Sequence, residues 1–363
     1  MAALPADQSL SADKDRLMDE FSASGRWIAS RARDWYERLP WLVGANFVPS
    51  SAANQLEMWQ AETFDPEGID RELGWAADIG MNSMRVFLHD LLWSHGVRGF
   101  EDRISRYLDI ASSRGISTML VLFDSVWNPD VALGPQPEPR PGIHNSQWVQ
   151  GPGRALADRA DWARLEDYVS GVVSAFGQDE RVIVWDVWNE PSNLNGGRFA
   201  ELTDKWELIS ELLPQVFQWV RAAAPSQPLT SGVWAGKTLY DDAHARIQID
   251  NSDIISFHDY QTPERFEAKL RDLPRDRPLF LTEYMARTPG STFEGILPIA
   301  KRERIASYCW GLVAGRSQTL YPWDSWSTPY IEAQPDPWFH DVFHKDGRPY
   351  RADEVALIRA ITA

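Results

Sequence analysis

The sequence has a single cysteine, no long apolar run and a shortage of basic residues, and each of these excludes a class of protein. Because Cys309 is the only cysteine, no disulfide can form within the chain, and a small disulfide-stapled secreted domain is excluded. No run approaches the ~18 apolar residues of a membrane span, so we expect no membrane partner. The 36 basic residues face 52 acidic ones, a net charge of −16, which argues against a nucleic-acid partner and favours neutral or cationic ligands.

The first residues also lack the basic and apolar regions of a signal peptide, so we expect a cytoplasmic protein unless a leader was removed. What the chain has in excess is tryptophan, with 18 residues. Indole faces stack on the C–H faces of sugar rings, although large core residues account for most tryptophans in any protein.

Short apolar runs alternate with amphipathic segments along the chain. The runs expected to be strands are residues 41–47, 82–88, 116–123, 182–188, 228–233, 253–258, 278–284 and 317–323. Between them, apolar residues recur at helical spacing, as from Trp162 to Phe176, and Cys309 is expected at a buried helix position. Eight strands alternating with helices predict an α/β protein with a closed (β/α)8 barrel, the TIM barrel, rather than an open sheet.

One domain is predicted, with residues 41–363 as the barrel and residues 1–40 as an extension packed on it. Within the extension, residues 27–39 predict a helix across the barrel bottom. Residues 134–152 are too rich in Pro and Gly for regular structure, and residues 323–343 predict a similar loop whose aromatic side chains wall a cleft. Both loops are expected on the active-site face.

Two glutamates each close an apolar run, Glu190 in VIVWDVWNEP and Glu283 in PLFLTEY. They are 93 residues apart, which is 31 residues for each of three strand-helix units. This agrees with ~250 residues divided among eight units, so we place Glu190 on strand four and Glu283 on strand seven. The alternatives are a loop carboxylate for Glu190 and a helix cap or surface charge for Glu283.

Strands four and seven lie on opposite sides of a barrel mouth, where two carboxylates can flank a glycosidic bond. Retaining hydrolysis needs them ~5–5.5 Å apart, one to attack the anomeric carbon and one to protonate the leaving oxygen. The acid then needs a raised pKa, and the attacking group must stay ionised.

Other polar residues in or after the runs are candidates for supporting roles. Arg85 is a lone charge inside strand two, and a buried cation is usually paired with a carboxylate, here Glu283. His258 and Tyr260 follow strand six, where the Tyr260 hydroxyl can bond to Glu283, unless they simply end the strand. Asn189 can donate to a substrate 2-hydroxyl.

Five further residues are expected to contact sugar. His89, Asp90 and Asp124 follow strands two and three and suit sugar hydroxyls, with helix caps or satisfied loop polars as the alternative. Trp323 is expected to end strand eight as a stacking floor and Trp127 to form a wall, with core packing as the alternative for both.

With these motifs the sequence resembles clan A glycoside hydrolases, the 4/7 superfamily, and looks most like cellulase-type family 5, with some likeness to families 2 and 39. The motifs are Trp188-Asn189-Glu190-Pro191, Thr282-Glu283-Tyr284, Arg85, His258 with Tyr260, and Trp323. The resemblance implies that Glu190 is the acid/base and Glu283 the nucleophile. It also implies that Arg85 and Tyr260 support Glu283 and that Trp323 floors the subsite of the attacked sugar.

The expected function is therefore hydrolysis of β-linked oligosaccharides or glycosides with retention, through a covalent glycosyl-enzyme and without metal or organic cofactor. The missing leader favours imported substrates and exo action. An endo-acting β-glucanase, xylanase or mannanase, transglycosylation, and a sugar-binding barrel without catalysis are the alternatives. A metal hydrolase built on His89, His258 and Asp124 is a further rival, but no His-x-His or His-Glu-x-x-His spacing supports it.

Overall fold

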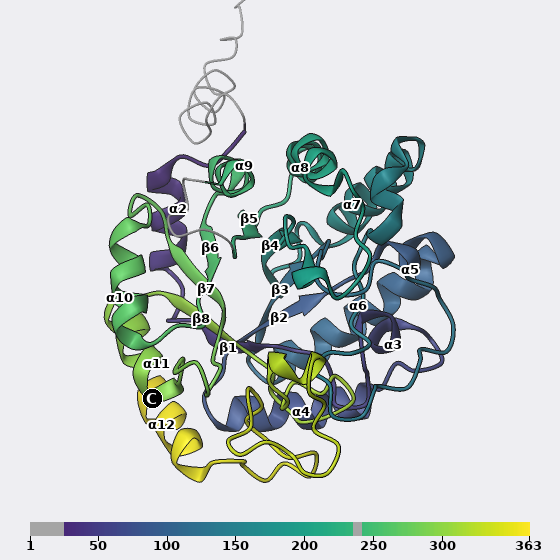
Figure 1. Ribbon diagram of the computed structural model, residues 1–363. Helices are drawn as coiled ribbons and strands as arrows, with labels where there is room; N and C mark the ends of the chain where they lie inside the picture. Colours follow the sequence, from purple (N-terminus) through teal and green to yellow (C-terminus); the bar gives the residue numbers. More distant parts are fainter. Residues whose placement is uncertain (1–24, 235–241) are drawn as a thin grey trace, which may run out of the picture.

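The computed structural model describes residues 25–234 and 242–363, with eight parallel strands at the centre and helices around them (Figure 1). The strands are β1 (Val43–Asn46), β2 (Ser83–Phe87), β3 (Ser117–Val121), β4 (Val182–Asn189), β5 (Leu229–Gly232), β6 (Ile255–His258), β7 (Leu279–Tyr284) and β8 (Ala306–Trp310). Their order is β5-β4-β3-β2-β1-β8-β7-β6, and a parallel bridge between Val233 and Phe257 joins the two outer strands. The predicted (β/α)8 barrel is confirmed.

The helices cover the outside of the barrel and give it a buried core between the two layers. They are α2 (Ala29–Glu37), α3 (Gln55–Trp59), α4 (Pro66–Asp78), α5 (Asp90–His95), α6 (Val97–Ser113), α7 (Trp162–Phe176), α8 (Lys205–Ala222), α9 (Ala243–Asn251), α10 (Pro263–Asp272), α11 (Phe293–Arg302) and α12 (Ala352–Thr362), with short 3-10 helices η1 (Gly153–Ala157), η2 (Arg159–Asp161), η3 (Asn195–Gly197) and η4 (Trp323–Trp326). Within the described residues, none of these helices combines the length and apolar character that a bilayer crossing requires.

Seven predicted strands agree with the structure to within two residues, but the eighth was wrong. Strand β8 is Ala306–Trp310, and residues 317–323 lie in the loop that follows it. Cys309 is buried in this strand rather than in a helix, in register with Ala45 of β1 and Tyr284 of β7. The segment ASYCW is short and has no β-branched residue, and it pairs with β1 on one side and β7 on the other.

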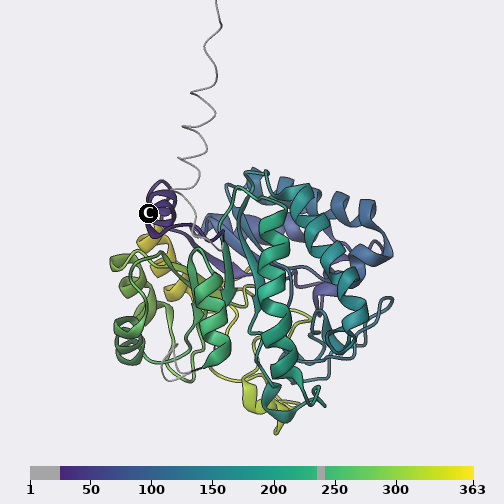
Figure 2. The same ribbon diagram turned by 90° about the horizontal axis from the view of Figure 1, so that it is seen from above.

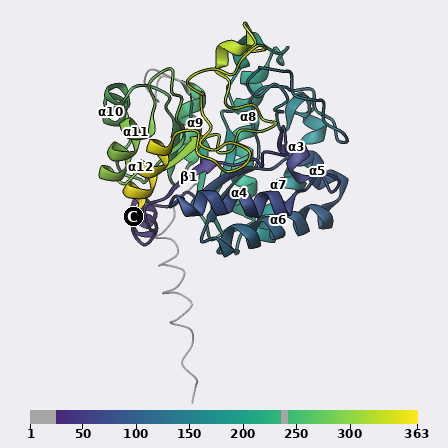
Figure 3. The same ribbon diagram turned by 90° about the horizontal axis from the view of Figure 1, so that it is seen from below.

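Helix α2 closes the bottom of the barrel, as predicted for residues 27–39. Tyr36 packs on Phe280 with ring centroids 5.2 Å apart, and Arg304 donates to the carbonyl of Leu39 at 2.6 Å. Residues 1–24 of the predicted extension lie outside the described part. Figures 2 and 3 both show α2, in purple, at the end opposite the yellow-green segment around η4. The carboxyl ends of the strands therefore face that segment.

Two long loops meet over the carboxyl ends of the strands. One runs from β3 to η1 and contains the predicted loop 134–152, and the other follows β8. Backbone N–H groups join them, donating from Asn145 to Ser317 O (3.1 Å), from His144 to Ser325 Oγ (2.9 Å) and from Tyr330 to Gly142 O (3.0 Å). We call the joined segments 142–150 and 315–330 the loop wall, because they restrict access to the barrel mouth from one side.

Candidate active site

Glu190 and Glu283 face each other across a cavity of about 910 Å³ at the barrel mouth. Glu190 follows directly on β4 with a left-handed φ of 43°, a conformation that non-glycine residues adopt rarely and that is concentrated at functional sites. Glu283 lies inside β7, beside a register irregularity that pairs it with His258. One carboxylate oxygen of each glutamate and a ring nitrogen of His258 all lie within 4.8 Å of one another. This is close to the separation that retention requires.

Glu190 is held by a neutral donor and a neutral imidazole. Asn193 Nδ2 donates to its Oε2 at 2.6 Å, and His258 Nδ1 lies 2.6 Å from its Oε1. Burial raises the pKa of Glu190 to about 7 and lowers the pKa of His258 to about 4. A proton shared between the two therefore rests on Glu190, whose hydroxyl then donates to Nδ1.

Glu283 is held by donors that favour its charged form. Arg85 Nη1 donates to Oε1 at 3.1 Å, and the Tyr260 hydroxyl donates to Oε2 at 2.8 Å, as the sequence predicted. Burial raises the pKa of Glu283 to about 7, the neighbouring Glu190 carboxylate adds to this rise, and Arg85 and the Tyr260 hydroxyl act in the opposite direction. When the two carboxyl groups share one proton, the guanidinium of Arg85 stabilises the charged form of Glu283. The proton therefore lies on Glu190.

Arg85 is fully buried and is fixed mainly by residues that the sequence analysis did not identify. Its Nη2 and Nε both donate to Asp186 Oδ2, at 2.7 and 3.0 Å, and its Nη1 also donates to Asn46 Oδ1 at 2.8 Å. Asp186 balances the guanidinium charge and orients Nη1 toward Glu283. Arg85 does not line the cavity, so it positions Glu283 rather than binding substrate. The signal for Asp186 was present, because it too is a lone charge inside an apolar strand.

His89 and Asp90, predicted to bind sugar, do not line the cavity. The His89 ring caps α5 by accepting from the N–H of Leu91 at 3.2 Å, and its other nitrogen contacts the carbonyl of Gln150 at 2.9 Å. Asp90 is buried and pairs with Arg164 at 2.7 Å. The helix-cap interpretation is the one that the geometry supports here.

Asp124 and Asn189 also lie below the cavity rather than in its lining. Asp124 accepts from Trp148 Nε1 at 2.7 Å, from the N–H of Val126 at 3.0 Å and from Asn189 Nδ2 at 2.9 Å. Asn189 Oδ1 in turn accepts from Arg85 Nη2 at 2.6 Å. Both side chains are engaged with the protein, and they brace the carboxyl ends of β3 and β4.

Four tryptophans line the cavity, Trp127, Trp234, Trp310 and Trp323, and the sequence predicted Trp127 and Trp323. Trp127 lies after β3 with a φ of 70° and stacks on Trp326 at 5.3 Å between centroids. Trp323 lines the cavity from η4 and not from a strand end, which corrects its predicted place. Trp310 ends β8 and was missed because residues 306–310 were interpreted as helix.

Among residues 25–234 and 242–363, the one group of three potential metal ligands is Glu190, His258 and Glu283. Neither His89 nor Asp124 belongs to it, so the metal site weighed from the sequence is not assembled. An ion at this group would occupy both carboxylates at once, and it would leave neither a protonated acid nor a free nucleophile.

Comparison with known families and structures agrees with this site. The model of the family described as Cellulase (glycosyl hydrolase family 5) matches residues 78–303, more than half of the chain, from the end of α4 to α11. A search of curated proteins gave no match.

Several solved structures share the fold. An exo-β-1,4-mannosidase, Op5Man5 from Opitutaceae bacterium strain TAV5, is similar with a TM-score of 0.59 and 16% identity, over 94% of this chain and 62% of that chain. A GH5_18 protein from Streptomyces cattleya in complex with Manβ1-4GlcNAc has a TM-score of 0.59 and 14% identity, over 89% and 79%. A β-1,4-mannanase from the sea hare Aplysia kurodai has a TM-score of 0.52 and 17% identity, over 81% and 90%. This chain thus spans under two thirds of the first of these proteins.

Proposed function

The chain belongs to glycosyl hydrolase family 5, and from this premise we propose that it is a retaining O-glycosyl hydrolase that removes single sugars from the non-reducing ends of β-linked oligosaccharides or glycosides. The observation that carries the exo assignment is that the cavity opens on only one side of the glutamate pair. Residues that lie near the carboxyl ends of β3 to β8 or in the segments after them line it, and none that follow β1 or β2 do so.

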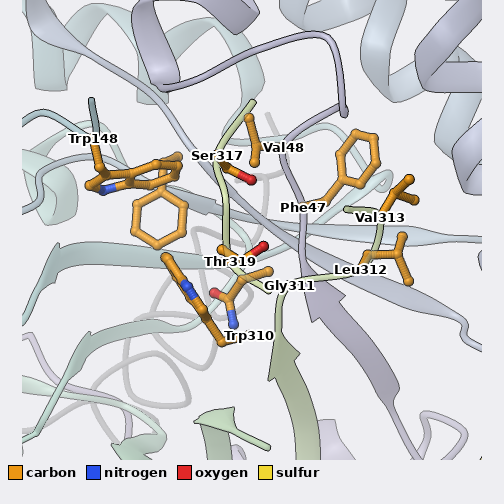
Figure 4. A pocket seen from close by; sticks show the side chains of 11 residues that line it. Phe47, Val48, Trp148, Trp310, Gly311, Leu312, Val313, Ser317 and Thr319 are labelled. Carbon is orange, nitrogen blue, oxygen red and sulfur yellow. The ribbon is translucent and has the colours of Figure 1, made fainter. Parts of the chain in front are cut away.

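The side above β1 and β2 is filled by aromatic side chains. Phe87 packs edge-on against Trp148 and Trp310, at centroid distances of 5.3 and 5.8 Å. Figure 4 shows Trp148 and Trp310 on one side of this region and Phe47 on the other. The space left between them is about 10 Å³, room for about one water molecule and none for a sugar ring.

The leaving group occupies the open side of the cavity. Glu190 must reach the glycosidic oxygen, so the departing sugar lies next to Glu190 and its cavity neighbours Asn193 and Trp234. The attacked sugar then occupies the blind end, against Trp310 and the loop wall. A blind end accepts one sugar, and the product of each cleavage is a monosaccharide.

The geometry supports a double displacement in which every group has a place. A Glu283 oxygen bonds to the anomeric carbon while the bond to the leaving oxygen breaks, and that oxygen takes the proton from Glu190. Water then attacks the same carbon, gives a proton back to Glu190 and releases Glu283. Before substrate binds, the neutral ring of His258 accepts a hydrogen bond from the Glu190 hydroxyl at Nδ1. In the first step the leaving oxygen of the substrate takes that proton instead.

For the sugar, we propose β-mannosides as the first substrates to test. The support is the printed description of two similar structures, an exo-β-1,4-mannosidase and a protein holding Manβ1-4GlcNAc.

We expect purified protein to cleave one or more nitrophenyl β-glycosides in the presence of EDTA and to release only monosaccharide from the β-1,4-linked oligosaccharides of the same sugar. Chromatography of early time points measures product size. Mixed oligosaccharide products would show an endo enzyme, and EDTA-sensitive turnover would contradict the two-glutamate mechanism. Binding without turnover on the whole panel would favour the inactive sugar-binding barrel.

A further inference from the structure

Exposed tryptophan gathers on the open side of the cavity. The described residues have five exposed large hydrophobic side chains, and three of them, Leu194, Trp206 and Trp234, follow β4 or β5. Trp206 is 51% exposed at the start of α8, and Trp234 is 38% exposed just after β5. Exposed apolar side chains that lie together, unlike singly scattered ones, mark binding surfaces and ligand grooves.

The two tryptophans are fixed through a common residue. Trp206 Nε1 donates to the carbonyl of Ser192 at 3.0 Å, and Trp234 Nε1 donates to the Ser192 hydroxyl at 3.3 Å. Ser192 is two residues beyond Glu190 in the sequence, so both rings are anchored to the segment that carries the acid. Because each indole N–H is already bonded, the rings offer their apolar surface rather than a hydrogen-bond donor. We call this pair the tryptophan platform.

We propose that the tryptophan platform binds the sugars of the leaving group, Trp234 the first of them and Trp206 a later one, so that the preferred substrates are oligosaccharides with at least two sugars on the leaving side. This rests on the proposed function, since it takes the leaving group to depart past Glu190. The order follows from position, because Trp234 lines the cavity and Trp206 lies outside its lining.

The chemistry of the platform suits sugar rings better than other ligands of comparable size. The C–H faces of pyranose rings bury apolar area against indole, and their hydroxyls stay in water around it. A neutral sugar binds without any ion pair, whereas an acidic chain would be repelled by the net charge of −16 of this protein.

The test is a chain-length series. For the sugar whose nitrophenyl β-glycoside is cleaved, kcat/KM is measured on the β-1,4-linked di-, tri- and tetrasaccharide. In the wild type we expect kcat/KM to rise with length. Trp234→Ala should lower it about tenfold on all three oligosaccharides, and Trp206→Ala by a similar factor only on those that reach it. The nitrophenyl glycoside, which has no second sugar, should be cleaved normally by Trp206→Ala.

Ile331→Ala is the matched control, because Ile331 is 66% exposed on the loop after β8 and does not line the cavity. This variant should have the wild-type kcat/KM on every substrate. All variants should keep the wild-type melting temperature within a few degrees. Equal kcat/KM at every length in the wild type, or equal losses for Trp206→Ala at every length, would refute the platform while leaving the glycosidase intact. A Trp206→Ala variant that changes only the sedimentation coefficient would show a protein contact instead. Failure to cleave any β-glycoside would refute the proposed function itself.

Discussion

Glu283→Gln is expected to lower kcat by about 10⁴-fold or more on every substrate, aryl glycosides included, because no carboxylate remains to form the glycosyl-enzyme. Steady-state kinetics with a nitrophenyl glycoside and an oligosaccharide measure the loss. A better leaving group should not reduce this loss of kcat, since formation of the glycosyl-enzyme is blocked for both substrates. A variant that keeps more than about a hundredth of the wild-type rate would place the nucleophile elsewhere.

The same variant has a built-in folding control. Burial raises the pKa of both Glu190 and Glu283 to about 7 from an ordinary 4.5, so the folded glutamate pair holds its protons more tightly than the unfolded chain does. The resulting stability is complete below about pH 4.5 and is lost as the pH rises through about 7. Glutamine has no charge to bury, and Arg85 keeps its pair with Asp186. At pH 8, Glu283→Gln should therefore melt no lower than the wild type, whereas a lower melting temperature would attribute lost activity to misfolding.

Glu190→Ala is expected to separate substrates by their leaving groups. On oligosaccharides, whose leaving oxygen needs a proton, kcat/KM should fall about 10²–10⁴-fold. On dinitrophenyl glycosides, whose leaving group needs none, kcat/KM should stay near the wild-type value, while kcat falls because water is no longer activated. Equal losses of kcat/KM on both substrates would reject Glu190 as the acid.

Two further measurements distinguish a lost acid/base from a damaged site. Azide, which needs no general base, should restore kcat of Glu190→Ala on the activated substrate and yield a β-glycosyl azide. The wild type should lose activity on oligosaccharides as the pH rises through about 7, where Glu190 gives up its proton. With the activated substrate, the kcat/KM profile of Glu190→Ala should lack this fall, and a persistent fall would assign it to another group.

The sequence was sufficient to predict the barrel and the positions of Glu190 and Glu283 on it, because both depend on strong local signals. A parallel strand buried on both faces is apolar throughout, and Glu190 and Glu283 each close such a run. The eighth strand failed where that signal is weak, since ASYCW has only five residues and none of them is β-branched. The error also displaced the strand-end tryptophan from Trp310 to Trp323.

The roles of the buried polar residues next to the cavity could not be predicted, because they depend on which polar atoms have no protein partner after folding. His89, Asp124 and Asn189 have the chemistry of sugar ligands, yet capping, a loop turn and Arg85 engage them. The loop wall was equally out of reach, since its hydrogen bonds join residues about 175 apart in the chain, as between Ile143 and Gln318. Loops of this length carry no periodicity from which their path can be predicted.

The central claim, that Glu283 attacks the sugar, is tested most directly by trapping the intermediate. A 2-deoxy-2-fluoro dinitrophenyl β-glycoside of the preferred sugar slows both chemical steps but leaves formation of the glycosyl-enzyme feasible, so the enzyme should accumulate with one sugar attached. Mass spectrometry of the digested protein should then find the added mass on the peptide that contains Glu283, and on no peptide of Glu283→Gln. A label on Glu190 or on another residue, or inactivation without any covalent sugar, would contradict the account.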